Sequence, residues 1–157
     1  MLIFSAVVLG AFKLADSKLY ILKELDEIKR FFMSLSHYIY VYKMPVARAV
    51  EQLVVQNTYR SRFILQLYRE LKNTNYFGSA YKNAVDFITY KKIVSAIEPL
   101  ADILGTCEAH TQALGIEQCC ATLDKLLTEI SEKYMSEAVL YRKLGVLSAM
   151  LAVIMIY

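Results

Sequence analysis

TCEAHTQALGIEQCCATLDKLLTEISEKYMSEAVLYRKLGVLSAMLAVIMIY, residues 106–157, is the stretch that decides the fold, because it has the pattern of one long helix whose polarity changes along its length. Its apolar residues recur at steps of three and four and share one face: Ile116, Cys119, Cys120, Leu123, Leu126, Leu127, Ile130, Tyr134, Ala138 and Tyr141. The other face is charged, and Glu129 and Lys133 stand in the order that favours an ion pair. After Lys143 no charged residue follows. A helix that becomes apolar on all sides predicts that its surroundings change from protein and water to lipid.

The N-terminal segment MLIFSAVVLGAF, residues 1–12, is a second apolar end. It lacks a positive region before it and is followed by Lys13 and Lys18, so it does not have the features of a cleaved signal peptide. As helices the two ends would span about 18 and 21 Å, against a hydrocarbon core of about 30 Å. Snorkelling of flanking cations and local thinning of the bilayer would close that gap. We therefore predict short membrane segments at 1–15 and 144–157, with interfacial insertion or burial in a protein core as the alternatives.

Charge is confined to the middle of the chain. The 18 Lys and Arg and the 15 Asp and Glu residues all lie between Lys13 and Lys143. The positive-inside rule assigns such a segment to the cytoplasm, which predicts a cytosolic domain over 16–143 with both termini pointing away from it. The net charge of +3 is spread over helices of mixed sign, and a nucleic-acid-binding surface would need a basic patch.

Helical periodicity continues through the middle of the chain. The first long helix is predicted to run to about Tyr42, and Pro45 ends it and opens the next. Asn57 or Thr58 is expected to cap the third helix, 73–78 to form a loop, and Pro99 to kink or divide a later helix. Gly105 is predicted to stop that helix and Thr106 to cap the last one. The predicted inward residues of the first helix are Leu22, Leu25, Ile28, Phe32, Leu35, Ile39 and Tyr42.

No segment shows sustained alternation of period two, so no sheet is expected. The predicted fold is all-α: a bundle of about six helices, with long N- and C-terminal helices that extend into the two short membrane segments.

Catalytic motifs are not found in the sequence, which has no glycine-rich phosphate loop, no Ser-His-Asp set and no HExxH. Only His37 and His110 could act as imidazole bases. Cys107 and Cys119 would lie about 18 Å apart on one helix, too far to share a metal ion. We therefore expect neither enzyme activity nor a metal or cofactor.

Tyrosines crowd the predicted end of the first long helix. Tyr38, Tyr40 and Tyr42 stand there with Lys43 and Pro45, and aromatic side chains with a polar tip suit protein interfaces. Helical spacing places Tyr38 and Tyr42 on one face and Tyr40 on another, so both a partner interface and core packing remain open. Near the C-terminus small residues would allow close packing of membrane helices from several copies of the chain: Gly145, Ser148, Ala149 and Ala152.

The order of these parts resembles the stage III sporulation protein AB family over essentially the whole chain. The resemblance is carried by the apolar N-terminus, SLSHYIYVYKMPVARAVEQL at 34–53, Leu104-Gly105 and YRKLGVL at 141–147. Tyr40 and Pro45 match the family's pattern. His37 stands where the family tends to have a glutamate, and Met44 and Val46 replace its threonine and leucine.

The resemblance implies a protein of the mother-cell membrane facing the forespore. There it would be a structural platform or scaffold of the channel, a specialised secretion apparatus, that connects the two cells. Its cytosolic region would be similar to the helical domain of type II secretion and type IV pilus platform proteins. The implied partners are the sporulation ATPase, stage III sporulation protein AA, and other components of the channel. The alternative from another class is a small oligomeric membrane pore or transport protein.

Overall fold

Two long helices form the frame of the molecule, α1 (Leu2–Tyr40) and α7 (Ala109–Ile156). The computed structural model describes residues 2–74 and 76–156, and the side chains of 19–74, 76–137 and 140. Five shorter helices lie between the long ones: α2 (Val46–Gln56), α3 (Arg62–Asn73), α4 (Phe77–Val85), α5 (Lys91–Ile97) and α6 (Leu100–Ile103). No strand occurs in these described ranges, which confirms the all-α prediction. The helices number seven because Pro99 separates α5 from α6, as the sequence indicated.

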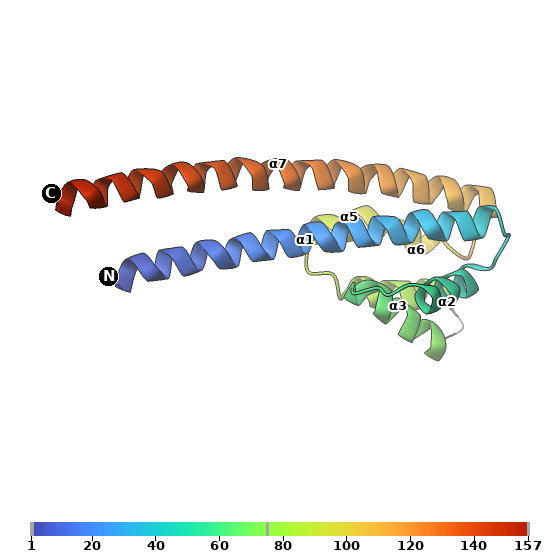
Figure 1. Cartoon of the computed structure of the whole chain (residues 1–157). Coiled ribbons are helices and arrows are strands. Elements are labelled where there is room, and N and C mark those ends of the chain that lie inside the picture. The colour runs from blue at the N-terminus through green and yellow to red at the C-terminus, as the bar shows by residue number, and fades with distance from the viewer. Residues whose placement is uncertain (1, 75, 157) are drawn as a thin grey trace.

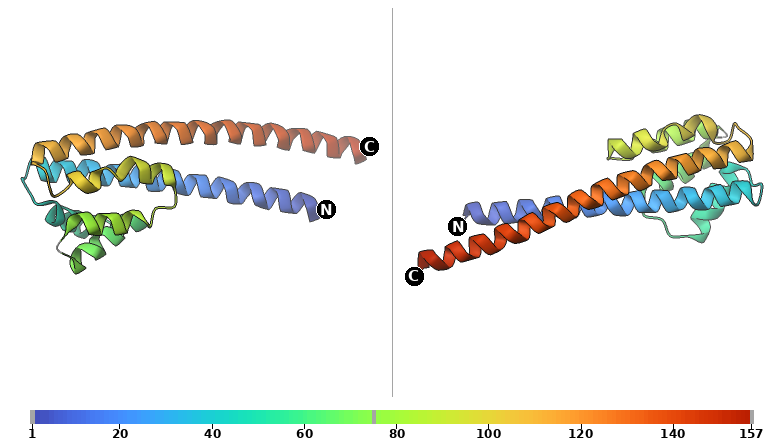
Figure 2. Two further views of the ribbon diagram at one scale, coloured as in Figure 1. Left: turned by 180° about the vertical axis from the view of Figure 1, so that it is seen from behind. Right: turned by 90° about the horizontal axis from the view of Figure 1, so that it is seen from above.

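The long helices run antiparallel and side by side, so that the N- and C-terminal ends of the chain lie at the same end of the molecule (Figure 1). The short helices all pack along the half that lies away from those ends (Figure 2). Helix α2 packs on α1, whereas α5 and α6 pack on α7. Helices α3 and α4 pair with each other, and α3 also contacts α2 while α4 contacts α6. The result is a hairpin stem with a bundle at its far half.

The terminal parts of α1 and α7 are continuous helix over 2–15 and 144–156. Over the residues that the structure describes, none of the helices offers an apolar stretch long enough to cross a bilayer. The side chains of the two predicted membrane segments lie outside the described residues. The side chains of the predicted helix-packing residues lie outside them too: Gly145, Ser148, Ala149 and Ala152.

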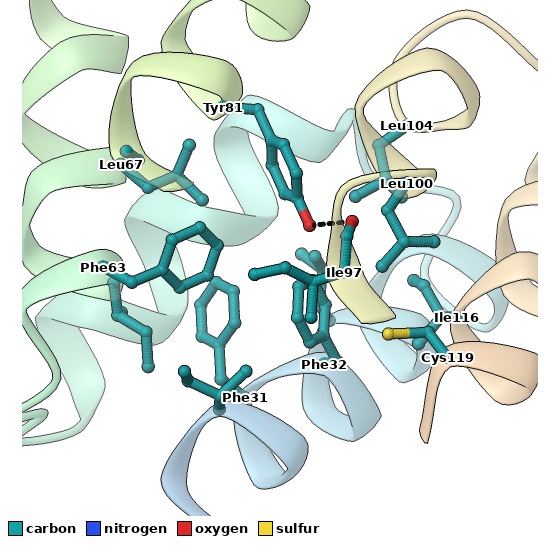
Figure 3. Packing of buried hydrophobic residues seen from close by; sticks show 14 of the residues in the cluster. Phe31, Phe32, Phe63, Leu67, Tyr81, Ile97, Leu100, Leu104, Ile116 and Cys119 are labelled. Atoms are coloured by element: carbon teal, nitrogen blue, oxygen red, sulfur yellow. Dashed lines mark hydrogen bonds between the residues drawn. The ribbon is translucent and has the colours of Figure 1, made fainter. Parts of the chain in front are cut away.

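Aromatic side chains from α1, α3 and α4 form the centre of the core (Figure 3). The ring of Phe32 lies 6.1 Å from that of Phe63, which lies 5.6 Å from that of Tyr81. Phe31 is also fully buried, with its ring 5.6 Å from that of Tyr59. The predicted stripe on the first helix omitted Phe31, because α1 is covered on two sides and buries a wider face than one row of residues. Its buried members are Leu25, Ile28, Phe31, Phe32, Leu35 and Ile39.

The predictions for the end of α1 and the start of α3 were wrong. Tyr42 was expected to point inward, but α1 ends at Tyr40 and Tyr42 is 61% exposed. Asn57 or Thr58 was expected to cap α3, which instead begins at Arg62 after the N-cap residue Ser61. Helix α3 begins later because of a contact with α1: the carboxylate of Glu27 accepts hydrogen bonds from the backbone N–H groups of Arg60 and Ser61.

The turn before α7 follows the sequence more closely. Gly105 has a positive φ of 81°, a conformation that glycine adopts without strain, and it ends the segment after α6 as predicted. Helix α7 begins at Ala109, so Thr106 lies in the turn and donates its hydroxyl to backbone carbonyls of α6 instead of capping α7. The predicted pair of Glu129 and Lys133 is confirmed at 3.2 Å, and Lys92 of α5 joins it at 2.7 Å.

Candidate docking surface

The five residues predicted for a partner interface lie together at the tip of the bundle, where the chain leaves α1 and enters α2. This tip is the end of the molecule away from both chain ends (Figure 1). The structure separates the two interpretations of the tyrosines. Tyr38 is partly buried against the core and donates its hydroxyl to the side-chain oxygen of Gln56 at 2.7 Å. Tyr40 and Tyr42 are 48% and 61% exposed, so they are surface residues.

Neighbouring groups hold these exposed rings in place. The ring of Tyr42 lies 5.4 Å from that of His37, and the ring of Tyr40 lies 6.1 Å from that of His110 on α7. Lys43 adopts a positive φ of 52° and places its Nζ 4.6 Å from the centre of the Tyr40 ring, a cation–π contact. Pro45 is exposed at the start of α2. The tip therefore presents two ordered aromatic rings beside a cation.

A groove of about 640 Å³ continues from the tip between α1 and α7. Its lining is formed by Lys29, Met33, Ser36, His37, Tyr40, Val41, His110, Ala113, Leu114, Ile116, Glu117, Cys120, Ala121 and Asp124. Three large apolar side chains stand open to solvent there, since Met33 and Val41 are each 54% exposed and Leu114 is 45% exposed. A smaller hollow of about 400 Å³ lies on the other side of Met33 and His37. We call the groove and the tip residues 38–45 together the docking surface.

The sequence pattern did not predict that Met33, Val41 and Leu114 share a surface. A signal for the groove was present on α1, where Met33, His37 and Tyr40 follow one another at steps of four and three and define a second row beside the core row. A row of that kind becomes a groove only when α7 lies next to it. The pairing of helices so far apart in the sequence cannot be inferred from periodicity alone.

The inner end of the groove carries an ion pair between Lys29 of α1 and Asp124 of α7. Cys120 lies beside it, and burial raises the pKa of its thiol. Burial likewise raises the pKa of the adjacent Cys119 to about 12. Both thiols are therefore protonated at neutral pH. Among the described residues no three His, Cys, Asp or Glu side chains gather in a way that could hold a metal ion.

Two antiparallel long helices, short helices packed along half of their length and an apolar groove at the tip define a hairpin-like helical bundle. The family model described as stage III sporulation protein AB matches residues 1–157. The chain belongs to this family, which confirms the resemblance found in the sequence and gives the protein a role in stage III of sporulation. Neither the comparison with curated proteins nor that with solved structures gives a match.

Proposed function

We propose that the protein is a non-catalytic platform in the mother-cell membrane that faces the forespore. Its apolar ends tether it there, and its cytosolic bundle holds components of the channel between the two cells in the way that a secretion platform protein holds its motor. The docking surface binds the sporulation ATPase, stage III sporulation protein AA. Family membership supports a role in sporulation. The position of the docking surface relative to the two chain ends supports the role of a platform.

The observation that carries the proposal is the position of the docking surface at the end of the hairpin opposite the two chain ends (Figure 1). At a helical rise of about 1.5 Å per residue, Tyr40 lies about 38 Å along α1 from residue 15. With residues 1–15 and 144–157 in the bilayer, the docking surface would therefore project well into the cytosol. A soluble partner could reach it without contact with lipid.

The chemistry of the surface also favours a protein partner. Aromatic residues and methionine are enriched in protein interfaces, and Tyr40, Tyr42 and Met33 are all exposed here. The contacts of the two tyrosine rings with His110 and His37 order them before binding. Less side-chain entropy is then lost when a partner packs against them.

A binding experiment with matched substitutions tests this role. The full-length protein in a non-ionic detergent is titrated with the purified ATPase. We expect Val41→Asp to weaken binding by at least about tenfold, because a buried interface residue would become charged. Val55→Asp is the control, since Val55 is 72% exposed on α2 and lies outside the docking surface. Equal binding by both variants would contradict docking at this surface.

Cysteine labelling tests the tether. In a Cys107→Ser background the remaining Cys119 and Cys120 are buried, so single cysteines placed at Ile3 and Ile156 can be followed separately. A platform with both ends across the membrane is labelled at these positions from the side opposite the cytosol. Recovery of the protein from lysates without detergent, as a species that membranes do not pellet, would contradict the tether. The alternative pore would instead produce conductance when the pure protein is reconstituted in vesicles.

A further inference from the structure

The groove of the docking surface has helices for both of its walls. Its lining residues belong to α1, to α7 and to Val41 just after α1, so the five short helices leave this side of the helix pair uncovered. Along α7 the lining runs from His110 to Asp124, which is about 21 Å at a rise of about 1.5 Å per residue. The groove is therefore about four helical turns long.

The form of these walls restricts what can fill the groove. The backbone N–H and C=O groups of α1 and α7 pair within the helices, so neither wall can pair with an extended strand of a partner. A helix satisfies its own backbone groups and can enter an apolar groove without leaving them unpaired. The groove is thus suited to a helix.

The side chains along the groove leave room for such a helix. Ser36, Ala113 and Ala121 are small residues of the lining, and helices approach each other closely where the side chains at the contact are small. Met33 on α1 and Leu114 on α7 place large apolar side chains on the two walls, and they are 54% and 45% exposed. An occupant that covers both must present a continuous apolar stripe, as an amphipathic helix does.

Charge distinguishes the middle of the groove from its inner end. Lys29 is the one Lys or Arg among the described lining residues, and it pairs with Asp124 at the inner end. Glu117 is exposed on α7, seven residues from both His110 and Asp124, which places it in the middle of the groove. No ion pair of the described side chains includes Glu117. The charge that the groove offers a partner is therefore negative.

We infer that the groove binds an amphipathic helix of the partner, with an apolar stripe against Met33 and Leu114 and a basic residue against Glu117. This inference deepens the proposed function, because it rests on the docking surface as the binding site and states what the partner presents there. A second copy of the chain fits less well. Two copies placed groove to groove about a two-fold axis at the middle would bring their Glu117 carboxylates together.

Fluorescence anisotropy with the full-length protein in a non-ionic detergent tests the inference. The probes are three labelled peptides of about 18 residues, slightly longer than the groove. One has leucines at helical spacing flanked by lysines, and the second has the same leucines flanked by glutamates. The third has the composition of the first, with its leucines scrambled so that they share no helical face.

We expect the lysine peptide to bind several-fold more tightly than the glutamate peptide, which is the effect of a partly exposed ion pair. We expect the scrambled peptide to bind at least about tenfold more weakly than the lysine peptide, because it cannot cover both walls. The net charge of the chain is +3, so a general attraction between charges would favour the glutamate peptide instead.

A charge reversal within the groove is the decisive variant. Glu117→Lys should reverse the preference, so that the glutamate peptide binds more tightly. Glu51→Lys makes the same change at an exposed position of α2 outside the groove and should leave the preference unchanged. Leu114→Ser should weaken the binding of both helical peptides several-fold, whereas Leu65→Ser, at a position of α3 that is 38% exposed, should not.

The outcomes separate this inference from the proposed function. Equal binding of the helical and scrambled peptides, or a preference that Glu117→Lys leaves unchanged, overturns the inference. Dimerisation that Leu114→Ser abolishes, measured by light scattering, also overturns it, because the groove would then hold a second copy. Failure of all peptides to bind, with ATPase binding that Val41→Asp weakens, overturns the helix and leaves the proposed function standing. Peptide binding with the expected preference, in a protein that does not bind the ATPase, supports the helix and overturns the proposed partner.

Discussion

The hydroxyl of Tyr81 on α4 donates a hydrogen bond of 2.8 Å to the backbone carbonyl oxygen of Ile97, the last residue of α5 (Figure 3). Both residues are fully buried. Burial raises the pKa of Tyr81 well above its ordinary value, which keeps the hydroxyl protonated and able to donate. Because water does not reach this carbonyl, Tyr81 is the group that pairs with it.

Tyr81→Phe therefore should destabilise the fold although it keeps the ring. The variant leaves the carbonyl of Ile97 buried without its side-chain partner, which costs about 1–3 kcal/mol. Far-UV circular dichroism during denaturation measures the loss. Tyr76→Phe is the control, since Tyr76 is 65% exposed. Equal stability of the two variants would mean that the bond contributes nothing net.

The middle of the chain should fold without its ends. Every residue of the described core lies between Leu25 and Ile130, so a fragment of residues 18–141 keeps the whole core. We expect this fragment to be helical, to unfold cooperatively and to stay in solution without detergent. Circular dichroism and size-exclusion chromatography check these three properties. A fragment that aggregates or loses its helicity would show that the terminal segments belong to the folding unit.

Much of the core was predictable from helical spacing. Leu25, Ile28, Phe32, Leu35 and Ile39 of α1 are buried as their spacing predicted. Such residues need only a local signal, because a row of apolar side chains on a helix must be covered by something. What covers them is not encoded locally. Phe31 was missed for this reason, since its burial depends on Tyr59 from the segment before α3.

The position of the residues that form the candidate docking surface was predicted in part. The cluster from Tyr38 to Pro45 could be found because its members are neighbours in sequence and their composition is typical of interfaces. The groove beside it could not, because its two walls come from residues about eighty positions apart, such as Met33 and Leu114. Tyr38 also packs against the core and donates a hydrogen bond to Gln56, whereas helical spacing left open whether its ring faces the core or a partner.

The three cysteines should react very differently with thiol reagents. Cys107 is exposed, whereas Cys119 and Cys120 are buried and burial raises the pKa of both thiols. Because the thiolate is the reactive form, we expect one thiol per chain to react in the native protein and all three after unfolding. A colorimetric thiol assay with and without denaturant measures this. Rapid reaction of a second native thiol would contradict the packing of α7 against the bundle.

Gly105→Ala should destabilise the turn before α7. The positive φ of 81° is strained for any residue with a Cβ atom, which costs about 1–2 kcal/mol. The new Cβ would lie 3.4 Å from the Cβ of Phe77, an ordinary van der Waals distance, so the cost comes from the backbone conformation. Gly105→Asn should lose less stability than Gly105→Ala, because asparagine tolerates the left-handed backbone region. Melting temperatures in the order wild type, Asn and Ala test the argument, and an Ala variant as stable as the wild type would contradict it.

Glu24 should make the stability depend on pH. Its side chain is 5% exposed, and burial raises the pKa of the carboxyl above its ordinary value of 4.5, an effect that Arg62 opposes and Glu27 reinforces. A raised pKa means that the folded state holds the proton more tightly than the unfolded state. The stabilising contribution is thus fully present below the unfolded pKa and is lost as the pH rises through the folded pKa. At neutral pH the fold must keep a charged carboxylate out of water, which costs free energy.

Glu24→Gln removes this cost, so we expect the variant to gain stability relative to the wild type as the pH is raised from about 4 to about 7.5. The measurement is the difference in melting temperature between the two proteins at each pH. Glu51→Gln, at an exposed position of α2, controls for the loss of one negative charge. A difference for Glu24→Gln that stays constant across this range would show that the charged form is not penalised. The carboxylate would then have to be hydrated through the hollow of about 500 Å³ between α1 and the segment before α3, which Glu24 lines.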